Sequence, residues 1–459
     1  MAPNYNILSI FLILSLHFLS ILATGNNHIT DRKSLEIIIG GGSDDSPAPS
    51  PEQEDFSPPS PPSETPSAPP PRPLPPPSPP PLIFSSPLIK KVFPVIKNFQ
   101  KLIEDDPKKI LKTWVGTDIC AQDTYIGLEC AKFPGTNDDA LGSIQFNNFN
   151  FRGKKLRLDN FLDKLEEVTI FHANSNNFLG SVPKVSNLKY LFELDLSNNK
   201  LSGEFPSSVL KATNLTFLDL RFNSFSGSVP PQVFNLDLDV LFINDNNLAQ
   251  RLPENLGSIT ALYLTFANNR FRGPIPASIG DIKSLQEVLF LNNKLTGCLP
   301  YQIGNLNRAT VFDVESNELT GPIPYSFGCL NKMEQLNLAR NKFYGTIPEI
   351  LCELSSLKNL SLSSNYFTQV GPKCRTLIKR KILDVGMNCI RGLANQRTWW
   401  ECARFFMRRK NCPNSKSFFY IPCGKDPHRI KPDQEGLLDG QASPPVSYGA
   451  LNPDRIRNL

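Results

Sequence analysis

The side chains best suited to binding chemistry in this chain are carboxylates and aromatic rings that recur at one register of a repeated pattern. Seven acidic residues occupy this register against two basic ones, Arg221 and Arg340, although residues 141–372 as a whole hold 20 acidic and 20 basic residues. Together with the rings, the candidate binding residues are Glu193, Asp195, Phe217, Asp219, Phe222, Phe242, Asp245, Tyr263, Glu287, Asp313 and Glu315. Exposed rings among carboxylates suit a partner that is positively charged and partly apolar. Alternatively, some of the rings only cover their neighbours on a sheet.

Catalysis is not predicted. Paired carboxylates such as Asp313 and Glu315 could support glycoside hydrolysis, but no feature of the sequence builds a cleft around them. His172 is the one histidine within the repeats, so neither a Cys-His nor a Ser-His-Asp arrangement has its base. Spacings typical of metal ligands are also missing from the sequence. We therefore expect no enzyme, no cofactor and no metal site.

The elements that must position these residues are units of 23 or 24 residues with the pattern L-x-x-L-x-L-x-x-N-x-L-x-G-x-[apolar]-P. Their asparagines are Asn176, Asn199, Asn223, Asn246, Asn269, Asn293, Asn317, Asn341 and Asn365. The two-residue period of a strand points the leucines inward and the candidate residues outward, while each asparagine amide can satisfy backbone groups of adjacent coils. Such a period is typical of leucine-rich repeats, whose stacked coils share one core. We predict an α/β fold: a leucine-rich repeat solenoid of about ten coils over residues 141–395, with a parallel-stranded concave sheet.

Both ends of the chain differ from the repeats. Residues 1–25 are predicted to be a secretory signal peptide, because an apolar run precedes small residues suited to cleavage. Residues 26–87 are expected to be disordered, with a proline-rich stretch at 47–81 that is either a stiff linker or a wall-interacting, carbohydrate-modified segment. Helical spacing of apolar residues between Leu88 and Trp114 predicts a helical N-terminal cap over 88–140. Residues 396–423 are expected to form a Cys-rich C-terminal cap and 424–459 a disordered tail; the mature protein is then secreted.

The cysteines are expected to form disulfides, because their even number behind a signal peptide favours an oxidising compartment. They are Cys120, Cys130, Cys298, Cys329, Cys352, Cys374, Cys389, Cys402, Cys412 and Cys423. Cys120 should pair with Cys130 in the N-terminal cap. Adjacent coils make the pairs 298–329 and 352–374 geometrically plausible. The pairing of the last four is left open.

The C-terminal cap is strongly basic. From Lys373 to Lys410 there are eleven lysines and arginines against Asp384 and Glu401, a balance of 11 minus 2, or +9. This region is either a solvated cap or a contact for polyanions such as pectin or an acidic membrane surface. No nucleic acid partner is expected for a secreted chain.

Two N-glycosylation sequons begin at Asn214 and Asn359. Asn214 precedes its strand, so a glycan there would lie at an edge. Asn359 has an outward strand position, so an occupied site would confine binding to earlier coils.

Several motifs resemble a known family. The Gly-x-Ile-Pro form of the repeat at 273–276 is similar to plant extracellular leucine-rich repeats. The caps resemble the leucine-rich repeat extensin family in the stretches WVGTDIC (114–120), GLEC (127–130), GCLP (297–300), VFDV (311–314), NCIRG (388–392) and QR (396–397). The proline-rich segment precedes the repeats here, and no Ser-Pro-Pro-Pro-Pro tail follows them, so the expected relative is an extensin-less one.

The resemblance implies a cell-wall protein whose repeats bind cationic, cysteine-rich signalling peptides of the rapid alkalinization factor type and link them to wall polymers. Two other functions use the same coils: an inhibitor of a secreted pectin-degrading enzyme, similar to polygalacturonase inhibitors, and a ligand-capturing partner of a receptor kinase.

Overall fold

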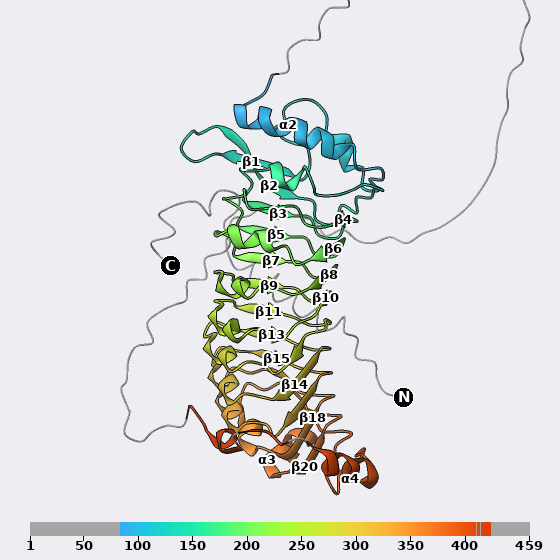
Figure 1. The fold of residues 1–459 in the computed structure, drawn as a ribbon, viewed down its shortest axis with the longest axis vertical. Coiled ribbons are helices and arrows are strands. Elements are labelled where there is room, and N and C mark those ends of the chain that lie inside the picture. The colour runs from blue at the N-terminus through green and yellow to red at the C-terminus, as the bar shows by residue number, and fades with distance from the viewer. Residues whose placement is uncertain (1–82, 410, 414, 424–459) are drawn as a thin grey trace, which may run out of the picture. The chain divides into compact units, whose positions relative to one another are not determined.

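The computed structural model describes residues 83–409, 411–413 and 415–423. The expected signal peptide, proline-rich stretch and C-terminal tail lie outside these residues. Within them, coils stack along one axis between a helical N-terminal end and a helical C-terminal end (Figure 1). No helix in the described part has the length and apolar character needed to span a membrane.

One face of the stack is a twelve-stranded main sheet, which is parallel except for its antiparallel β1–β2 pair. Its strands, in spatial order, are β1 (Leu128–Lys132), β2 (Asp139–Gln145), β3 (Ile170–His172), β5 (Glu193–Asp195), β7 (Phe217–Asp219), β9 (Val240–Phe242), β11 (Tyr263–Thr265), β13 (Glu287–Leu289), β15 (Val311–Asp313), β17 (Gln335–Asn337), β19 (Asn359–Ser361) and β21 (Leu383–Asp384). This arrangement confirms the predicted leucine-rich repeat solenoid and its parallel sheet.

Two shorter parallel sheets continue each coil beyond the asparagine. The first contains β4 (Leu179–Gly180), β6 (Lys200–Glu204), β8 (Ser224–Gly227) and β10 (Asn247–Leu248). The second contains β12 (Arg272–Gly273), β14 (Lys294–Cys298), β16 (Glu318–Gly321), β18 (Lys342–Ile347) and β20 (Tyr366–Val370). A turn of 3-10 helix then follows the proline in the successive coils, at Ser207–Lys211, Pro231–Asn235, Glu254–Ser258, Ala277–Asp281, Tyr301–Asn305, Tyr325–Cys329 and Glu349–Glu353.

The asparagines form a ladder of buried hydrogen bonds between coils. The side-chain amide of Asn293 donates to the carbonyls of Phe266, Phe290 and Leu291 at 2.9, 3.0 and 3.2 Å, and its oxygen accepts from the Phe271 N–H at 2.9 Å. The other repeat asparagines make the same set of bonds. Because buried backbone groups must be satisfied, this ladder fixes each turn and confirms the predicted role of the asparagine.

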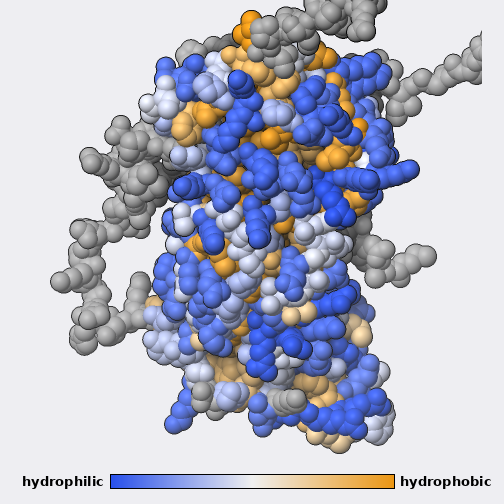
Figure 2. Space-filling model, turned by 45° about the horizontal axis from the view of Figure 1, so that its top comes forward, coloured by the Kyte–Doolittle hydropathy of each residue, from blue (hydrophilic) through white to orange (hydrophobic). Residues whose placement is uncertain are grey.

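The N-terminal cap is only partly the helical segment that was predicted. Helix α2 spans Pro87–Gln100, and Ser86 caps it by accepting a hydrogen bond from the Ile89 N–H. The later part of the stretch predicted to be helical, up to Trp114, contains only one 3-10 turn, Ile110–Thr113. Phe99 of α2 stacks on Phe161 of the repeats with ring centroids 3.8 Å apart, so the cap covers the first coils with aromatic rings. Figure 2 shows apolar surface gathered at this end, where Ile83, Val115 and Ile126 are exposed.

The C-terminal cap contains helix α3 (Pro372–Lys379), helix α4 (Trp399–Arg408) and a 3-10 turn at Ser415–Phe419. Phe405 of α4 stacks on Tyr366 of β20 with centroids 3.7 Å apart, which confirms that aromatic rings pack this cap on the last coils. Trp399 and Trp400 point elsewhere, since they are 61% and 72% exposed.

All ten cysteines are paired, and two predicted pairs, 120–130 and 352–374, are confirmed. The predicted bond between Cys298 and Cys329 is wrong. Instead, Cys298 pairs with Cys412 and Cys329 with Cys423, while Cys389 and Cys402 close the remaining bridge. The segment after α4 is therefore fastened to coils that precede it by 114 and 94 residues, a contact that spacing between neighbouring coils does not indicate.

Candidate functional site

The candidate residues lie on the side of the main sheet that faces away from the leucine core, here called the outward face. Strand register aligns them in two rows: Glu193, Phe217, Tyr263 and Glu287 occupy the first strand positions, and Asp195, Asp219, Phe242 and Asp313 the third. Phe222, Asp245 and Glu315 lie two or three residues after their strands end. The strand pairing confirms the predicted register for the eight candidate residues that belong to strands.

The expectation that the aromatic rings are open anchors is wrong for two of them. Phe242 and Tyr263 are only 8% and 9% exposed. Strands lie about 4.8 Å apart, so side chains in register cover one another. Phe242 meets the ring of Phe217 edge to face at 6.4 Å and carries the Arg221 guanidinium 4.9 Å above its own ring. These two rings therefore cover their neighbours on the sheet, as the alternative interpretation predicted.

Several of the candidate carboxylates are also buried, so they are not open to a partner as a binding role expects. Asp219 is fully buried, and burial raises its pKa to about 8, although the Arg221 guanidinium at 2.8 Å lowers it. Glu193 meets the imidazole of His172 at 2.7 Å. Burial acts to lower the pKa of His172, but the carboxylates of Glu193, Asp195 and Asp219 together outweigh burial and the net shift is upward. These pairs neutralise part of the acidic charge within the face.

A second buried group begins at β15, four strands beyond Asp219 in the main sheet. Burial raises the pKa of Asp313 to about 7, and its oxygens accept from the Glu315 N–H at 2.8 Å and the Asn337 amide at 3.0 Å. Glu315 in turn meets the Arg340 guanidinium at 3.2 Å. Sequence reasoning missed Asn337 and His172 as partners because their roles depend on cross-strand neighbours.

The buried carboxylates predict that the protein becomes less stable as pH rises. A carboxyl group with a raised pKa keeps its proton in the folded state after the unfolded chain has lost it, so its stabilisation is present at pH 4 and is lost as pH rises through about 7 for Asp313. Asp313→Asn removes this titration. From pH 5 to 8 we expect the titration of Asp313 to contribute a fall of roughly 2 to 3 kcal/mol in the free energy of unfolding, so the natural protein should lose about that much more stability than the variant. Denaturant unfolding at each pH measures it; Glu254→Gln, at an exposed position, is the control and should follow the natural protein.

One candidate ring stays accessible, and its backbone is unusual. Phe222 is 38% exposed and has φ +52°. The residue before every repeat asparagine has this left-handed conformation, which the chain fills mostly with asparagine, serine or aspartate. A bulky side chain there is an outlier that costs about 1 to 3 kcal/mol. Phe222 shares this departure with Arg340 and Met387, whereas Asn268 at the same position bonds to Asp245 at 2.9 Å.

Asp245 lies next to this ring along the stack. It is half-buried, and burial raises its pKa even though the amides of Asn244 and Asn268 donate to it. Arg221 stands beside the same group of residues, half-buried over Phe242. Three residues therefore remain accessible on a face whose other rings and carboxylates are largely packed. We call these three the rim: Arg221, Phe222 and Asp245.

Comparison with known proteins supports the fold. Residues 190–211, 214–236 and 332–354 match the family model for the Leucine Rich Repeat. The chain has the leucine-rich repeat fold. A plant ice-binding protein shares the fold, with TM-score 0.55 and 21% identity over 66% of this chain and 94% of that one. The ectodomain of the Arabidopsis receptor kinase HAESA, solved with an IDA peptide hormone, gives TM-score 0.51 and 24% identity over 68% of this chain and 54% of that one.

Sequence relatives narrow the resemblance. This leucine-rich repeat protein is 41% identical to leucine-rich repeat extensin-like proteins 4 and 2 of Arabidopsis thaliana over 209 and 210 residues, 45% of the chain. It is 33% identical to receptor-like protein 9b of the same plant over 32% of the chain. The matches cover 41%, 26% and 16% of those proteins, so the chain spans less than half of their length. The predicted similarity to extensin-like repeats is confirmed.

The two sequon asparagines of this leucine-rich repeat protein are exposed. Asn214 donates to the Lys189 carbonyl at 2.8 Å at the edge of its coil. Asn359 is the first residue of β19 and lies in register with Gln335 of the outward face. A glycan on Asn359 would therefore cover the outward face near its C-terminal end, away from the rim.

Proposed function

We propose that this is a secreted, extracellular plant cell-wall protein whose outward face recognises a basic peptide signal and links it to the wall. The observation that carries the proposal is the strained, exposed ring of Phe222 beside the half-buried carboxylate of Asp245. A ring held at an energetic cost is retained where it serves a contact. A cationic, cysteine-rich peptide of the rapid alkalinization factor type has the complementary chemistry.

The packed rings and carboxylates of the outward face support this contact in two ways. Rings and carboxylates that are already fixed by neighbours lose little conformational entropy when a ligand arrives, which favours binding. The ion pairs of Asp219 and Glu315 with Arg221 and Arg340 keep both guanidiniums in place along the face. An apolar side chain of the peptide would cover Phe222, and its lysine or arginine would approach Asp245.

The proposed location follows from redox chemistry and the relatives. Five disulfides persist in an oxidising compartment. The extensin-like relatives suggest the cell wall as that compartment.

The test replaces the strained ring with a residue that the repeats use at the same position. Phe222→Ser should weaken binding of a synthetic cationic, cysteine-rich peptide about tenfold or more, which corresponds to roughly 1.4 kcal/mol. Its free energy of unfolding should stay within about 1 kcal/mol of the natural value, because relief of strain offsets lost packing. Serine is preferred, since asparagine at this position would create a sequon with Asn223 and Ser224.

The matched control is Met387→Ser. Met387 has φ +55° and is 44% exposed, but it lies in the last half-coil, beyond the acidic strands. Calorimetric titration of the full secreted protein with the peptide should show that Met387→Ser binds it with the natural affinity. Equal affinity of Phe222→Ser and the natural protein, with both folded, would remove the proposed role of the rim.

A further inference from the structure

Arginines gather around helix α4 at the opposite end of the molecule from the N-terminal cap. A groove between α4 and the second short sheet is lined by Lys342, Arg397, Arg404, Arg408 and Arg409, with Glu401 as its one acidic residue. A neighbouring groove on the other side of α4 shares Arg397 and adds Arg375 and Arg391. Seven basic side chains thus line two grooves that meet at Arg397.

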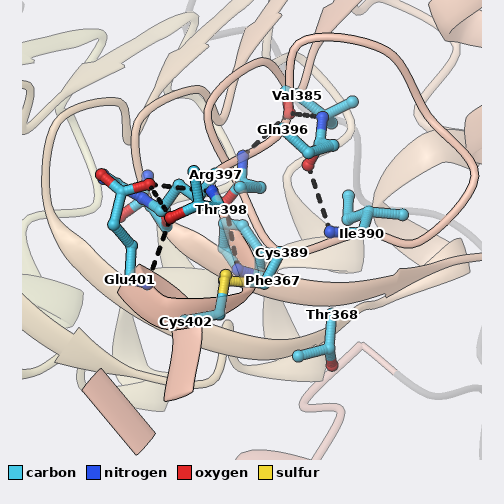
Figure 3. The surroundings of a disulfide bond; sticks show 12 residues. Phe367, Thr368, Val385, Cys389, Ile390, Gln396, Arg397, Thr398, Glu401 and Cys402 are labelled. Carbon is cyan, nitrogen blue, oxygen red and sulfur yellow. Dashed lines mark hydrogen bonds between the residues drawn. A yellow bond between two sulfur atoms is a disulfide. The ribbon is translucent and has the colours of Figure 1, made fainter. Parts of the chain in front are cut away.

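The groove's acidic residue offsets only part of this charge. Both bonds of the α4 capping box involve Glu401: its carboxylate accepts from the Thr398 N–H at 2.8 Å, and its own N–H donates to the Thr398 hydroxyl (Figure 3). The hydrogen bonds from Thr398 lower the pKa of Glu401, and the charges of Arg397 and Arg404 lower it further. One ionised carboxylate therefore faces five basic side chains in this groove, and the positive charge remains in excess.

Several of the guanidiniums are held in fixed positions. Arg397 donates to the Asn365 carbonyl at 2.8 Å and lies 4.4 Å above the Tyr366 ring, whose neighbour in the stack is Phe405. Arg409 lies 5.1 Å above the Tyr344 ring. The disulfide between Cys389 and Cys402 fastens α4 beside these rings (Figure 3). Planar guanidiniums in fixed positions suit bidentate recognition of carboxylates.

Arg404 and Arg408 indicate that an anion is expected in this groove. They are exposed and four residues apart on α4, so they share one helix face, where like charges destabilise the helix. The helix dipole favours cations near the last turn but does not require two on the groove side. A bound anionic chain would convert this repulsion into attraction.

A tryptophan favours a sugar polymer over other polyanions. Trp399 lines the neighbouring groove, meets the Trp400 ring edge to face at 4.5 Å and is still 61% exposed, so much of its indole is accessible to a ligand. The C–H face of a pyranose ring is apolar and stacks on such a ring, while the carboxylate of a uronic acid reaches out to a guanidinium. Grooves also fit a linear chain better than a flat lipid surface.

We propose that the two grooves flanking α4 bind a polyuronate chain, with Trp399 stacking on a sugar ring and Arg397, Arg404 and Arg408 holding successive carboxylates. This site specifies how the proposed function reaches the wall, but it lies on a different surface from the rim. A variant whose grooves no longer bind the polymer can therefore still bind the peptide, and a variant whose rim no longer binds the peptide can still bind the polymer.

The experiment measures binding of the full secreted protein to polygalacturonate, to its fully methyl-esterified form and to vesicles containing phosphatidylserine. The natural protein should bind polygalacturonate, and binding should weaken as salt rises because exposed charges are screened. The esterified polymer, which lacks carboxylates, should bind about tenfold more weakly or not at all.

Two variants locate the site. Arg404→Gln with Arg408→Gln should weaken polygalacturonate binding about tenfold. The matched control, Arg251→Gln with Arg272→Gln, removes two exposed arginines from adjoining coils of the repeats and should bind almost normally. Trp399→Ala should lower binding to the polymer while leaving any attraction to vesicles unchanged.

Three outcomes would overturn the proposal: equal losses in the two double variants, equal binding of the esterified polymer, or tighter binding to vesicles than to polygalacturonate. The last would assign the basic grooves to a membrane surface. Peptide affinity measured on the same Arg404 and Arg408 variant should remain natural, which separates failure of this site from failure of the rim.

Discussion

Replacing Asn293 with alanine is expected to lower the free energy of unfolding by about 2 to 3 kcal/mol. The substitution leaves the buried Phe271 N–H without its acceptor and removes one of two donors from each of three carbonyls, those of Phe266, Phe290 and Leu291. These carbonyls keep the Asn269 amide, the Asn317 amide and the Asn268 N–H as donors, so the loss is smaller than four full hydrogen bonds. A water molecule cannot readily replace an amide that reaches across two coils.

Denaturant unfolding measures this effect, with Asn307→Ala as control. Asn307 is an exposed asparagine near the start of the next coil, and its substitution should change stability by less than about 0.5 kcal/mol. A loss below about 1 kcal/mol for Asn293→Ala would mean that the ladder is not what fixes the turns.

The second large effect concerns the segment after α4. Replacing Cys298, Cys412, Cys329 and Cys423 with serine removes both bonds that fasten residues 411–413 and 415–423 to the earlier coils. A single bridge that closes a loop of about 100 residues contributes up to about 4.7 kcal/mol in the chain-entropy account. The bridge between Cys298 and Cys412 also fits closely, since Gly321, at φ +97°, leaves room for the Cys412 sulfur where a Cβ would collide.

We expect this variant to be cut by protease after α4 at temperatures where the natural protein is intact, while the repeats remain folded. Mass spectrometry of the fragments identifies the cut. Removal of the bridge between Cys120 and Cys130, at the other end of the solenoid, should leave the C-terminal segment resistant. Equal resistance of the variant and the natural protein would show that packing alone holds the segment.

The repeats could be predicted from sequence because each residue type answers a local requirement. The spacing of the asparagines determines the strand register, and the register determines which residues share the outward face. The covalent bonds of Cys298 and Cys329 could not be predicted this way, because a chain segment about a hundred residues later returns to these coils.

The burial of side chains on the outward face also could not be predicted from the sequence of a single coil. Whether Phe242 is open depends on Phe217 and Arg221 from the preceding coil, and the pKa of Asp313 depends on how its neighbours exclude water. One signal was present and unused: the asparagine, serine or aspartate before most repeat asparagines is typical of a left-handed backbone. Phe222 departs from that pattern, which could have separated it from the other rings.

The most direct measurement of the central claim is the position of a bound peptide on the protein. A cationic, cysteine-rich peptide that carries a photoreactive group should cross-link to the outward face between β5 and β13, with Phe222 and Asp245 among the labelled positions, and excess unlabelled peptide should suppress the reaction. Cross-links confined to the short sheets, to the N-terminal cap or to α4 would contradict recognition of a basic peptide by the outward face.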